Sequence, residues 1–90
     1  MMDIRKADVV ISQAGRDKGR LFYVFDIDEQ FATIADGKVR LIEKPKKKKL
    51  KHLSYFSDKE TVIREKIIIG EEITNAQLRK VLNQFQIPLG

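Results

Sequence analysis

Hydrophobic and polar positions alternate along the first half of the chain and divide it into short extended segments. Residues 7–13 contain a β-branched run, Val-Val-Ile, and are followed by a polar stretch with two glycines, which is typical of a strand followed by a turn. Residues 21–25 are all apolar, so both faces of the next strand begin apolar. We expect this strand to be covered on both sides or to show one aromatic side chain to a partner. A turn around Asp28 and Glu29 leads into a third strand.

The dipeptide Asp36-Gly37 lies between two alternating segments and predicts a second hairpin. Asp-Gly favours a two-residue turn with positive φ at both central positions, and this turn fixes the register of the flanking strands. The predicted inner face of the hairpin consists of Ala32, Ile34, Val39 and Leu41. The predicted outer face consists of Thr33, Lys38 and Arg40. By residue 43 the chain is therefore expected to form four short strands in meander order.

A run of four lysines at 46–49 follows Pro45. Like charges at this density resist compact structure, so residues 44–51 are predicted to form a flexible basic loop. Residues 53–57, Leu-Ser-Tyr-Phe-Ser, are the candidate for a fifth short strand.

The hydrophobic period changes near the end of the chain, where apolar residues follow the i, i+3, i+4, i+7 spacing of a helix face at Leu78, Val81, Leu82 and Phe85. Thr74 and Gln77 fit a capping box, and Pro88 is placed to stop the helix, which predicts a helix at about 75–86. We expect its apolar stripe to pack on the domain's own sheet. Residues 61–72 carry a β-branched run that fits an edge strand or an extended connector, and the pattern alone does not choose between them.

Composition narrows the class of protein. The 90 residues contain no cysteine and are 42% hydrophobic, which predicts one small domain plus a tail, without disulfides or thiolate metal sites. The longest apolar run is far shorter than the roughly 20 residues of a membrane span. The start of the chain also lacks the apolar core of a signal peptide. We therefore expect a cytoplasmic protein without a membrane partner.

The net charge of +5 is concentrated in the first part of the chain. Residues 1–53 contain 13 Lys and Arg against 8 Asp and Glu, whereas residues 54–90 contain 5 of each. Residues 38–52 alone carry 8 basic residues and one acid, a charge of +7. A positive field of this density attracts phosphate backbones or anionic lipid head groups.

Side chains suited to catalysis are few. His52 is the only histidine and stands beside lysines, which favours a solvated side chain over a general base or a metal ligand. The acids around Asp28 are typical of turns. Residues 15–19 begin and end with glycine, but they lack the Lys-Ser/Thr ending of a phosphate loop and precede a strand. Phe22 and Tyr23 are candidate stacking surfaces for bases, although core positions are favoured for both. We expect no enzyme, no cofactor and no metal site.

Residues 8–34, DVVISQAGRDKGRLFYVFDIDEQFATI, resemble the KOW motif, in which a strand, a basic glycine-containing turn, a longer strand, an acidic turn and a third strand follow one another. With the lysine-rich segment included, residues 5–54 look most like the KOW-containing large-subunit ribosomal proteins of the archaeal and eukaryotic L14 type and their small bacterial relatives. The resemblance implies a mainly β fold, a small SH3-like β-barrel over residues 1–57, with residues 58–90 forming a connector and the C-terminal α-helix. It also implies that the basic turn contacts RNA through Arg16, Lys18 and Arg20, with Gly19 as the glycine that marks the motif.

Three functional hypotheses follow. The first is a non-catalytic RNA-binding protein, associated with ribosomal RNA or the ribosome, that contacts phosphates through the basic turn and the lysine loop. Its RNA-binding residues are Arg16, Lys18, Gly19, Arg20, Lys44, Lys46, Lys47, Lys48, Lys49 and Lys51. The second is a protein-interaction module of the transcription or translation machinery, which resembles the KOW domains of elongation factors and uses the helical stripe to dock onto ribosomal proteins or RNA polymerase. The third is a general binder of nucleic acids or anionic surfaces.

Overall fold

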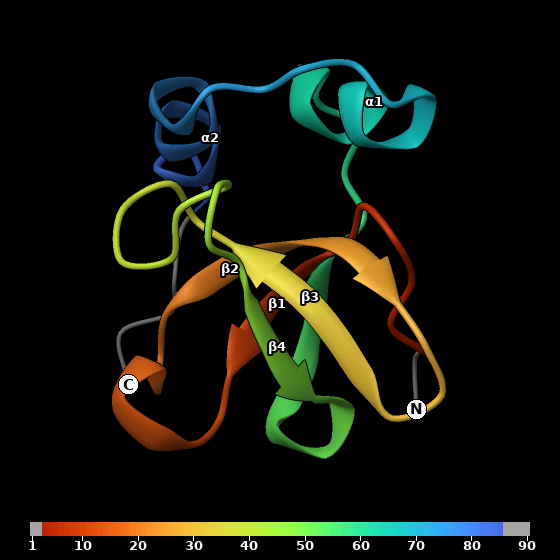
Figure 1. The fold of residues 1–90 in the computed structure, drawn as a ribbon, viewed down its shortest axis with the longest axis vertical. Coiled ribbons are helices and arrows are strands. Elements are labelled where there is room, and N and C mark those ends of the chain that lie inside the picture. The colour runs from red at the N-terminus through yellow and green to blue at the C-terminus, as the bar shows by residue number, and fades with distance from the viewer. Residues whose placement is uncertain (1–2, 86–90) are drawn as a thin grey trace.

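The computed structural model describes residues 3–85, which form a small, mainly β domain with a five-stranded antiparallel sheet and two short helices (Figure 1). The strands are β1 (Val9–Ser12), β2 (Leu21–Ile27), β3 (Phe31–Ala35), β4 (Lys46–Lys49) and β5 (Leu53–Ser57). The helices are α1 (Val62–Ile69) and α2 (Asn75–Leu82), and two short 3-10 turns are η1 (Gly15–Asp17) and η2 (Leu50–His52). The strand order in the sheet is β4-β3-β2-β1-β5, so the predicted fifth strand at 53–57 is confirmed.

The sheet is curled, because its two edge strands are neighbours in sequence. β4 and β5 stand at opposite ends of the strand order, and on a flat sheet four strand spacings would separate them by about 19 Å. Only η2 joins them, and the four residue steps from Lys49 to Leu53 span at most about 14 Å. The two edges therefore bend toward each other, as in a small barrel-like fold.

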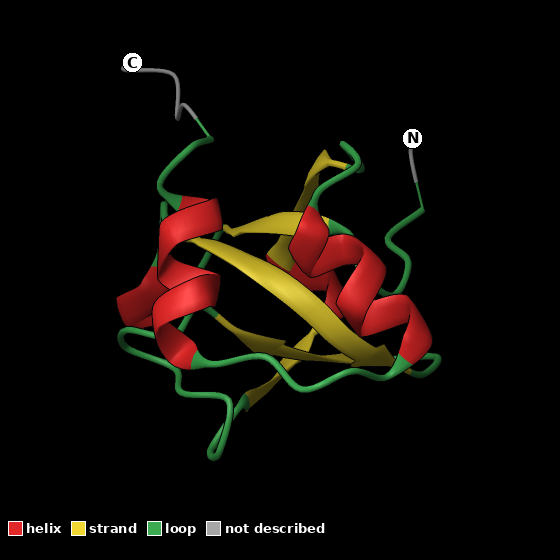
Figure 2. Cartoon of the chain, turned by 90° about the horizontal axis from the view of Figure 1, so that it is seen from above, coloured by secondary structure: helices red, strands yellow, loops and turns green. Residues whose placement is uncertain are grey.

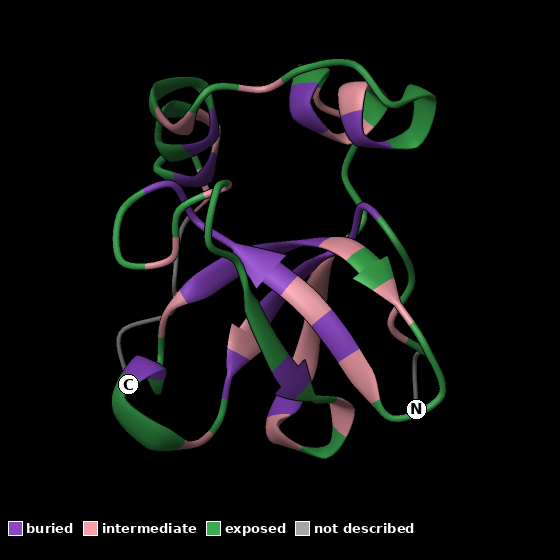
Figure 3. Cartoon of the chain, in the orientation of Figure 1, coloured by how far each residue is buried: buried purple, intermediate pink, exposed green. Residues whose placement is uncertain are grey.

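Strand β2 lies between two apolar clusters. Phe22 and Val24 belong to the cluster enclosed by the curled sheet, whereas Leu21 and Tyr23 belong to the cluster on the helix side. Phe22, Tyr23 and Val24 are all 0% exposed. Figure 3 accordingly shows the first part of β2 as buried. Of the two arrangements expected for this strand, the structure shows the one in which both faces are covered. Both aromatic rings are part of the core and offer no stacking surface to a base.

Both helices cover the same side of the sheet (Figure 2). The predicted capping box is present, since the Thr74 hydroxyl accepts from the Gln77 N–H and the Gln77 side chain accepts from the Thr74 N–H. The apolar stripe of α2 packs on the domain's own core, where Leu78 and Leu82 are buried. The helix ends at Leu82, earlier than predicted, and Pro88 lies outside the described residues. No helix in residues 3–85 is long and apolar enough to cross a membrane.

Residues 62–69 form a helix, so the prediction of an edge strand or extended connector is wrong. The Thr61 hydroxyl caps its start by accepting from the Arg64 N–H at 3.0 Å, and Gly70 ends it at a φ of 80°. β-Branched residues have modest helix propensity, but Ile63 and Ile67 are spaced i, i+4 and bury one stripe against the core. Tertiary packing therefore overrides the local preference.

The predicted second hairpin is also wrong, because residues 36–45 form a loop. Gly37 has the expected positive φ of 77°, but Asp36 does not. Instead, the Asp36 Oδ1 atom accepts three backbone N–H groups at 2.9, 3.0 and 2.9 Å, from Lys38, Val39 and Arg40. The chain wraps around this carboxylate and does not return along β3. Val39 and Leu41, predicted for the inner face, are 46% and 40% exposed.

The four lysines predicted to lie in a flexible loop form strand β4. They pair antiparallel with β3, from Phe31 opposite Lys49 to Ile34 opposite Lys46, in place of the predicted hairpin partners. Because a strand pairs through its backbone, β4 needs no apolar side chains, and its alternation divides the like charges between two faces. Lys48 lies opposite Ala32 and is buried, so the charge run contributes one residue to the interior.

Candidate nucleic-acid interface

The basic turn, residues 15–20, is a defined structure between β1 and β2. Gly15 and Gly19 have φ values of 76° and 86°, which L-residues rarely adopt. The Lys18 N–H donates to the Gly15 carbonyl at 3.2 Å and closes the short 3-10 turn. This backbone presents the side chains of Arg16 and Lys18 to solvent, as the sequence predicts.

Two other charged side chains of the basic turn are engaged by the loop at 36–45. Asp17 is 5% exposed and accepts from Arg40 Nε at 3.0 Å and Nη2 at 2.9 Å. Arg20 Nη2 donates to Asp36 Oδ2 at 3.3 Å. These two ion pairs join the turn to the loop, and removing either arginine would leave a buried carboxylate without its cation. They also neutralise Arg20, one of the predicted RNA-binding residues.

Lys48 connects β4 with the basic turn. The residue is 9% exposed, and its Nζ donates to the Ala14 carbonyl at 2.7 Å across 34 residues of sequence. A Cβ atom at Gly15 would lie 3.6 Å from the same nitrogen. The structure therefore brings the two predicted basic segments into contact, although Lys48 itself is used inside the fold and is not presented to solvent.

Lys47 is partly neutralised on the outer face of β4. Its Nζ lies 3.8 Å from Asp28 Oδ2 and 5.6 Å from the centroid of the Phe31 ring. The backbone N–H groups of Gln30 and Phe31 donate to Asp28 Oδ1 at 2.9 and 2.8 Å and, with Lys47, lower the pKa of that carboxyl. Asp28 is therefore a stable anionic partner for Lys47.

The predicted site residues separate into groups with different surroundings. Six are exposed and make no ion pair within residues 3–85, and we call them the free-cation set: Arg16, Lys18, Lys44, Lys46, Lys49 and Lys51. Arg20 and Lys47 are paired with carboxylates, Lys48 is buried, and Gly19 shapes the turn. The candidate interface is therefore the free-cation set, spread over the basic turn and the two ends of β4.

The sequence reasoning missed a groove beside the basic turn. This turn groove is lined by the end of the turn, the loop at 36–41 and α2, and it contains Arg20, Lys38 and Arg79. Arg79 Nη1 donates to the Gly37 carbonyl at 2.6 Å, so the helix holds the loop in place. No local signal joins these residues, because they come from three segments that meet only in the folded chain.

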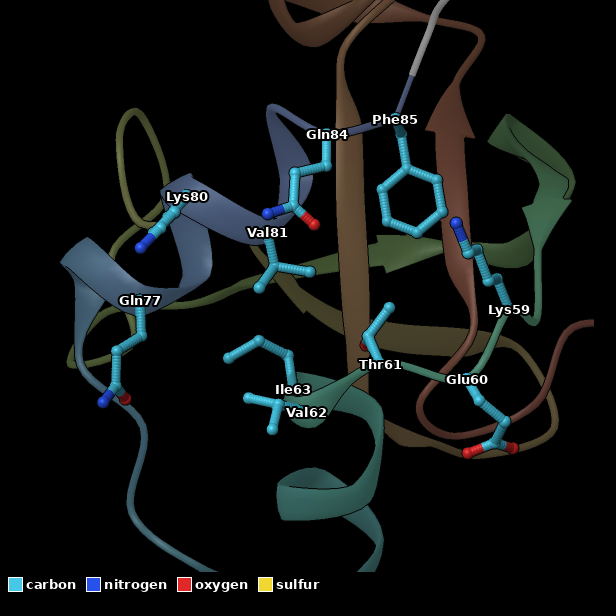
Figure 4. A pocket seen from close by; sticks show the side chains of 10 residues that line it. All are labelled: Lys59, Glu60, Thr61, Val62, Ile63, Gln77, Lys80, Val81, Gln84 and Phe85. Carbon is cyan, nitrogen blue, oxygen red and sulfur yellow. The ribbon is translucent and has the colours of Figure 1, made fainter.

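A second groove lies between α1 and α2 (Figure 4). Its apolar lining includes Val62, Ile63 and Val81, and its ionic side chains are Lys59, Glu60 and Lys80. Two cations and one carboxylate leave it with less positive charge than the turn groove. Lys59 and Lys80 are exposed and make no ion pair within the described part of the chain, so they provide matched controls for charge loss elsewhere.

Other chemistry-bearing side chains have structural surroundings. No group of three or more His, Cys, Asp or Glu that could hold a metal ion is found among residues 3–85. Burial raises the pKa of Tyr23, whose hydroxyl lies 2.7 Å from the Thr61 hydroxyl at the start of α1. No protein-family model matches the sequence, and no curated protein matches it either. Function is therefore inferred from the charge and geometry of the folded chain.

Proposed function

We propose that this protein is a non-catalytic RNA-binding protein that contacts RNA phosphates through the free-cation set, with ribosomal RNA as its target. The observation that carries the proposal is the contact between Lys48 and the Ala14 carbonyl at 2.7 Å. This contact brings the strand that carries Lys46 and Lys49 against the turn that carries Arg16 and Lys18. Several unpaired cations on adjoining segments give the sequence-independent affinity for phosphates that counterion release produces.

The fold supports the same proposal. The strands form a meander in which β5 returns to pair with β1, and a 3-10 turn joins β4 to β5. This arrangement fits the small SH3-like barrel implied by the KOW resemblance. The basic turn joins β1 to β2, with Gly19 at a φ of 86°. These features agree with a KOW-type role for Arg16 and Lys18.

Protection of the edge strand accounts for only some members of the free-cation set. Lysines on an edge strand prevent other chains from pairing with it, and β4 is an edge strand. That role does not require Arg16 or Lys18, which are on the basic turn, or Lys44 and Lys51, which flank the strand. The cations outside β4 therefore favour a ligand over edge protection alone.

The test compares two triple variants that lose the same charge. The first is Arg16→Gln, Lys18→Gln and Lys49→Gln, from the free-cation set. The control is Lys59→Gln, Lys66→Gln and Lys80→Gln, on or near the helices. Binding to labelled fragments of large-subunit ribosomal RNA is measured by fluorescence anisotropy between 50 and 200 mM salt, with matched DNA as competitor, and thermal unfolding is recorded for every protein.

We expect the free-cation variant to bind the RNA at least about tenfold more weakly, with a salt slope flatter by about 2 to 3, because each phosphate contact contributes about 0.7 to 0.9. The control variant should bind like the wild type. Both should keep their melting temperatures, since none of the six side chains is buried. Equal RNA binding by the two variants would contradict the proposed surface. Equal competition by DNA would favour the general nucleic-acid binder, because only contacts to the 2′-OH or to RNA shape prefer RNA.

A further inference from the structure

The turn groove carries more positive charge than its neighbours neutralise. Of its ionic side chains, Arg20, Lys38 and Arg79 are cations and Asp36 is the one carboxylate. Asp36 is already engaged by three backbone N–H groups and by Arg20. The charges of Lys38 and Arg79 therefore remain unbalanced within the groove.

The two unbalanced cations differ in how they are held. Lys38 is exposed, and its side chain makes no ion pair within residues 3–85. Arg79 donates one Nη1 hydrogen bond to the Gly37 carbonyl, a neutral partner that orients the guanidinium without cancelling its charge. An oriented guanidinium that keeps further N–H donors is well suited to a phosphate.

The loop that carries Lys38 is fixed against α2. A Cβ atom at Gly37 would collide with the backbone of Asn75, so glycine permits this close approach. The Asn75 side chain accepts from the Ile42 N–H at 2.9 Å and donates to the Glu43 carboxylate at 2.9 Å. The loop and α2, which form two walls of the groove, are therefore fixed before any ligand binds. Binding in the groove then costs little conformational entropy.

The groove also has an apolar wall and is continuous with the basic turn. Leu41 is 40% exposed at its side, and Leu82 contributes to its lining. Gly19 and Arg20 belong both to the turn and to the groove. An unpaired nucleotide presents both a phosphate and an unstacked base, so it can contact cations and apolar side chains together. In a duplex the bases are stacked inside the helix. The groove therefore fits an unpaired strand better than a duplex.

We infer that the turn groove binds the phosphates of an unpaired RNA strand as it leaves the basic turn, with Lys38 and Arg79 as the anchoring cations. This inference rests on the proposed RNA-binding function and extends it in two ways. It adds α2 to the interface, and it specifies single-stranded RNA next to structured RNA as the class of ligand.

The test uses an RNA hairpin with blunt ends and the same hairpin with a ten-nucleotide single-stranded extension at either end. Four proteins are compared by anisotropy: the wild type, Lys38→Gln, Lys38→Gln with Arg79→Gln, and the matched control Lys59→Gln with Lys80→Gln. Lys80 follows Arg79 on α2 but faces the other groove, so the control removes the same charge at a neighbouring position. Arg79→Lys is added to separate charge from the orientation of the loop.

We expect the extension at one end to tighten wild-type binding about tenfold and to steepen the salt slope by about 1.4, from two single-strand contacts. The double groove variant should bind both hairpins equally, Lys38→Gln and Arg79→Lys should keep part of the gain, and the control should keep all of it. No gain from either extension in the wild type, or a gain that survives in the double variant, would overturn the inference while leaving the proposed function intact. Failure of the wild type to bind either hairpin would overturn both.

Discussion

The basic turn and strand β4 both concentrate basic side chains but keep their shape in different ways. The turn depends on side chains, because Asp17 and Arg20 form ion pairs with Arg40 and Asp36 from a distant loop. β4 depends on its backbone, which pairs with β3 along its whole length. In each region some charged residues maintain the fold and the others face solvent.

The role of a cation in this molecule depends on its partner and not on its place in a charged run. Lys48 and Lys49 are adjacent and chemically identical, yet Lys48 is buried and donates to the Ala14 carbonyl, whereas Lys49 is exposed and makes no ion pair within residues 3–85. Changes to the fold-maintaining group should reduce stability, and changes to the free group should reduce RNA binding.

The largest effect is expected from reversing the charge of Lys48. Lys48→Glu would place a carboxylate in a buried position facing the Ala14 carbonyl, which should lower the free energy of unfolding by about 3 kcal/mol or more. Lys49→Glu, on the exposed face, should cost little stability and weaken RNA binding. Urea denaturation of both variants measures the difference, and similar stability losses would show that Lys48 is not buried as described.

Removing the carboxylate at the centre of the loop should have the next largest effect. Asp36→Ala leaves three backbone N–H groups and Arg20 without their acceptor, and should cost about 2 kcal/mol of unfolding free energy. Asp26→Ala is the control, because Asp26 is exposed and, within the described part of the chain, accepts only from the adjacent Ile27 N–H. Chemical denaturation should show a much smaller loss for the control. A comparable loss would mean that the loop does not depend on this carboxylate.

The two arginines of the basic turn should separate stability from binding. Arg20→Gln removes the ion pair to Asp36, in which the carboxylate is buried and the arginine is about one third exposed. This change should lower the free energy of unfolding by about 1 kcal/mol and alter RNA affinity little. Arg16→Gln should leave the melting temperature unchanged and weaken RNA binding severalfold. Calorimetry and anisotropy on the same preparations make the comparison. The reverse pattern would exchange the roles assigned to the two residues.

The smallest effect is expected at the exposed ion pair between Lys47 and Asp28. Hydrogen bonds lower the pKa of the folded-state Asp28 carboxyl, so its stabilisation is present above the unfolded-state pKa and is lost as the pH falls through the folded-state pKa. Asp28→Asn should therefore melt slightly below the wild type at neutral pH and converge with it in acid. Melting curves measured from pH 2 to 7 test the sign, and a gap that widens in acid would contradict it.

The local sequence pattern was sufficient to predict several strands and the start of α2. The strands at 9–12, 21–27 and 53–57 follow from β-branched and apolar runs, and the capping box placed the start of α2 at Asn75. Over residues 36–49 the predicted order of strand and loop is reversed in the structure. Three backbone N–H groups donate to Asp36, and these hydrogen bonds outweigh the hairpin preference of Asp-Gly. A strand made of lysines gives no apolar signal at all.

The candidate site could be predicted only by residue type. The sequence identifies exposed basic segments, and six of the residues named for the site are free cations in the structure. It could not show that Lys48 turns inward, that Asp17 is buried, or that Arg79 donates to the Gly37 carbonyl of the loop at 36–45. These features depend on contacts between residues 34, 23 and 42 positions apart in the chain.

Ultraviolet crosslinking in the protein's own cells tests the central claim most directly, provided that both the attached RNA and the attached peptides are identified. We predict a sharp peak on one segment of ribosomal RNA and crosslinked peptides from residues 15–20 and 44–51. Scattered or absent RNA, or crosslinks confined to α1, would contradict the proposal that the free-cation set is an RNA-binding surface.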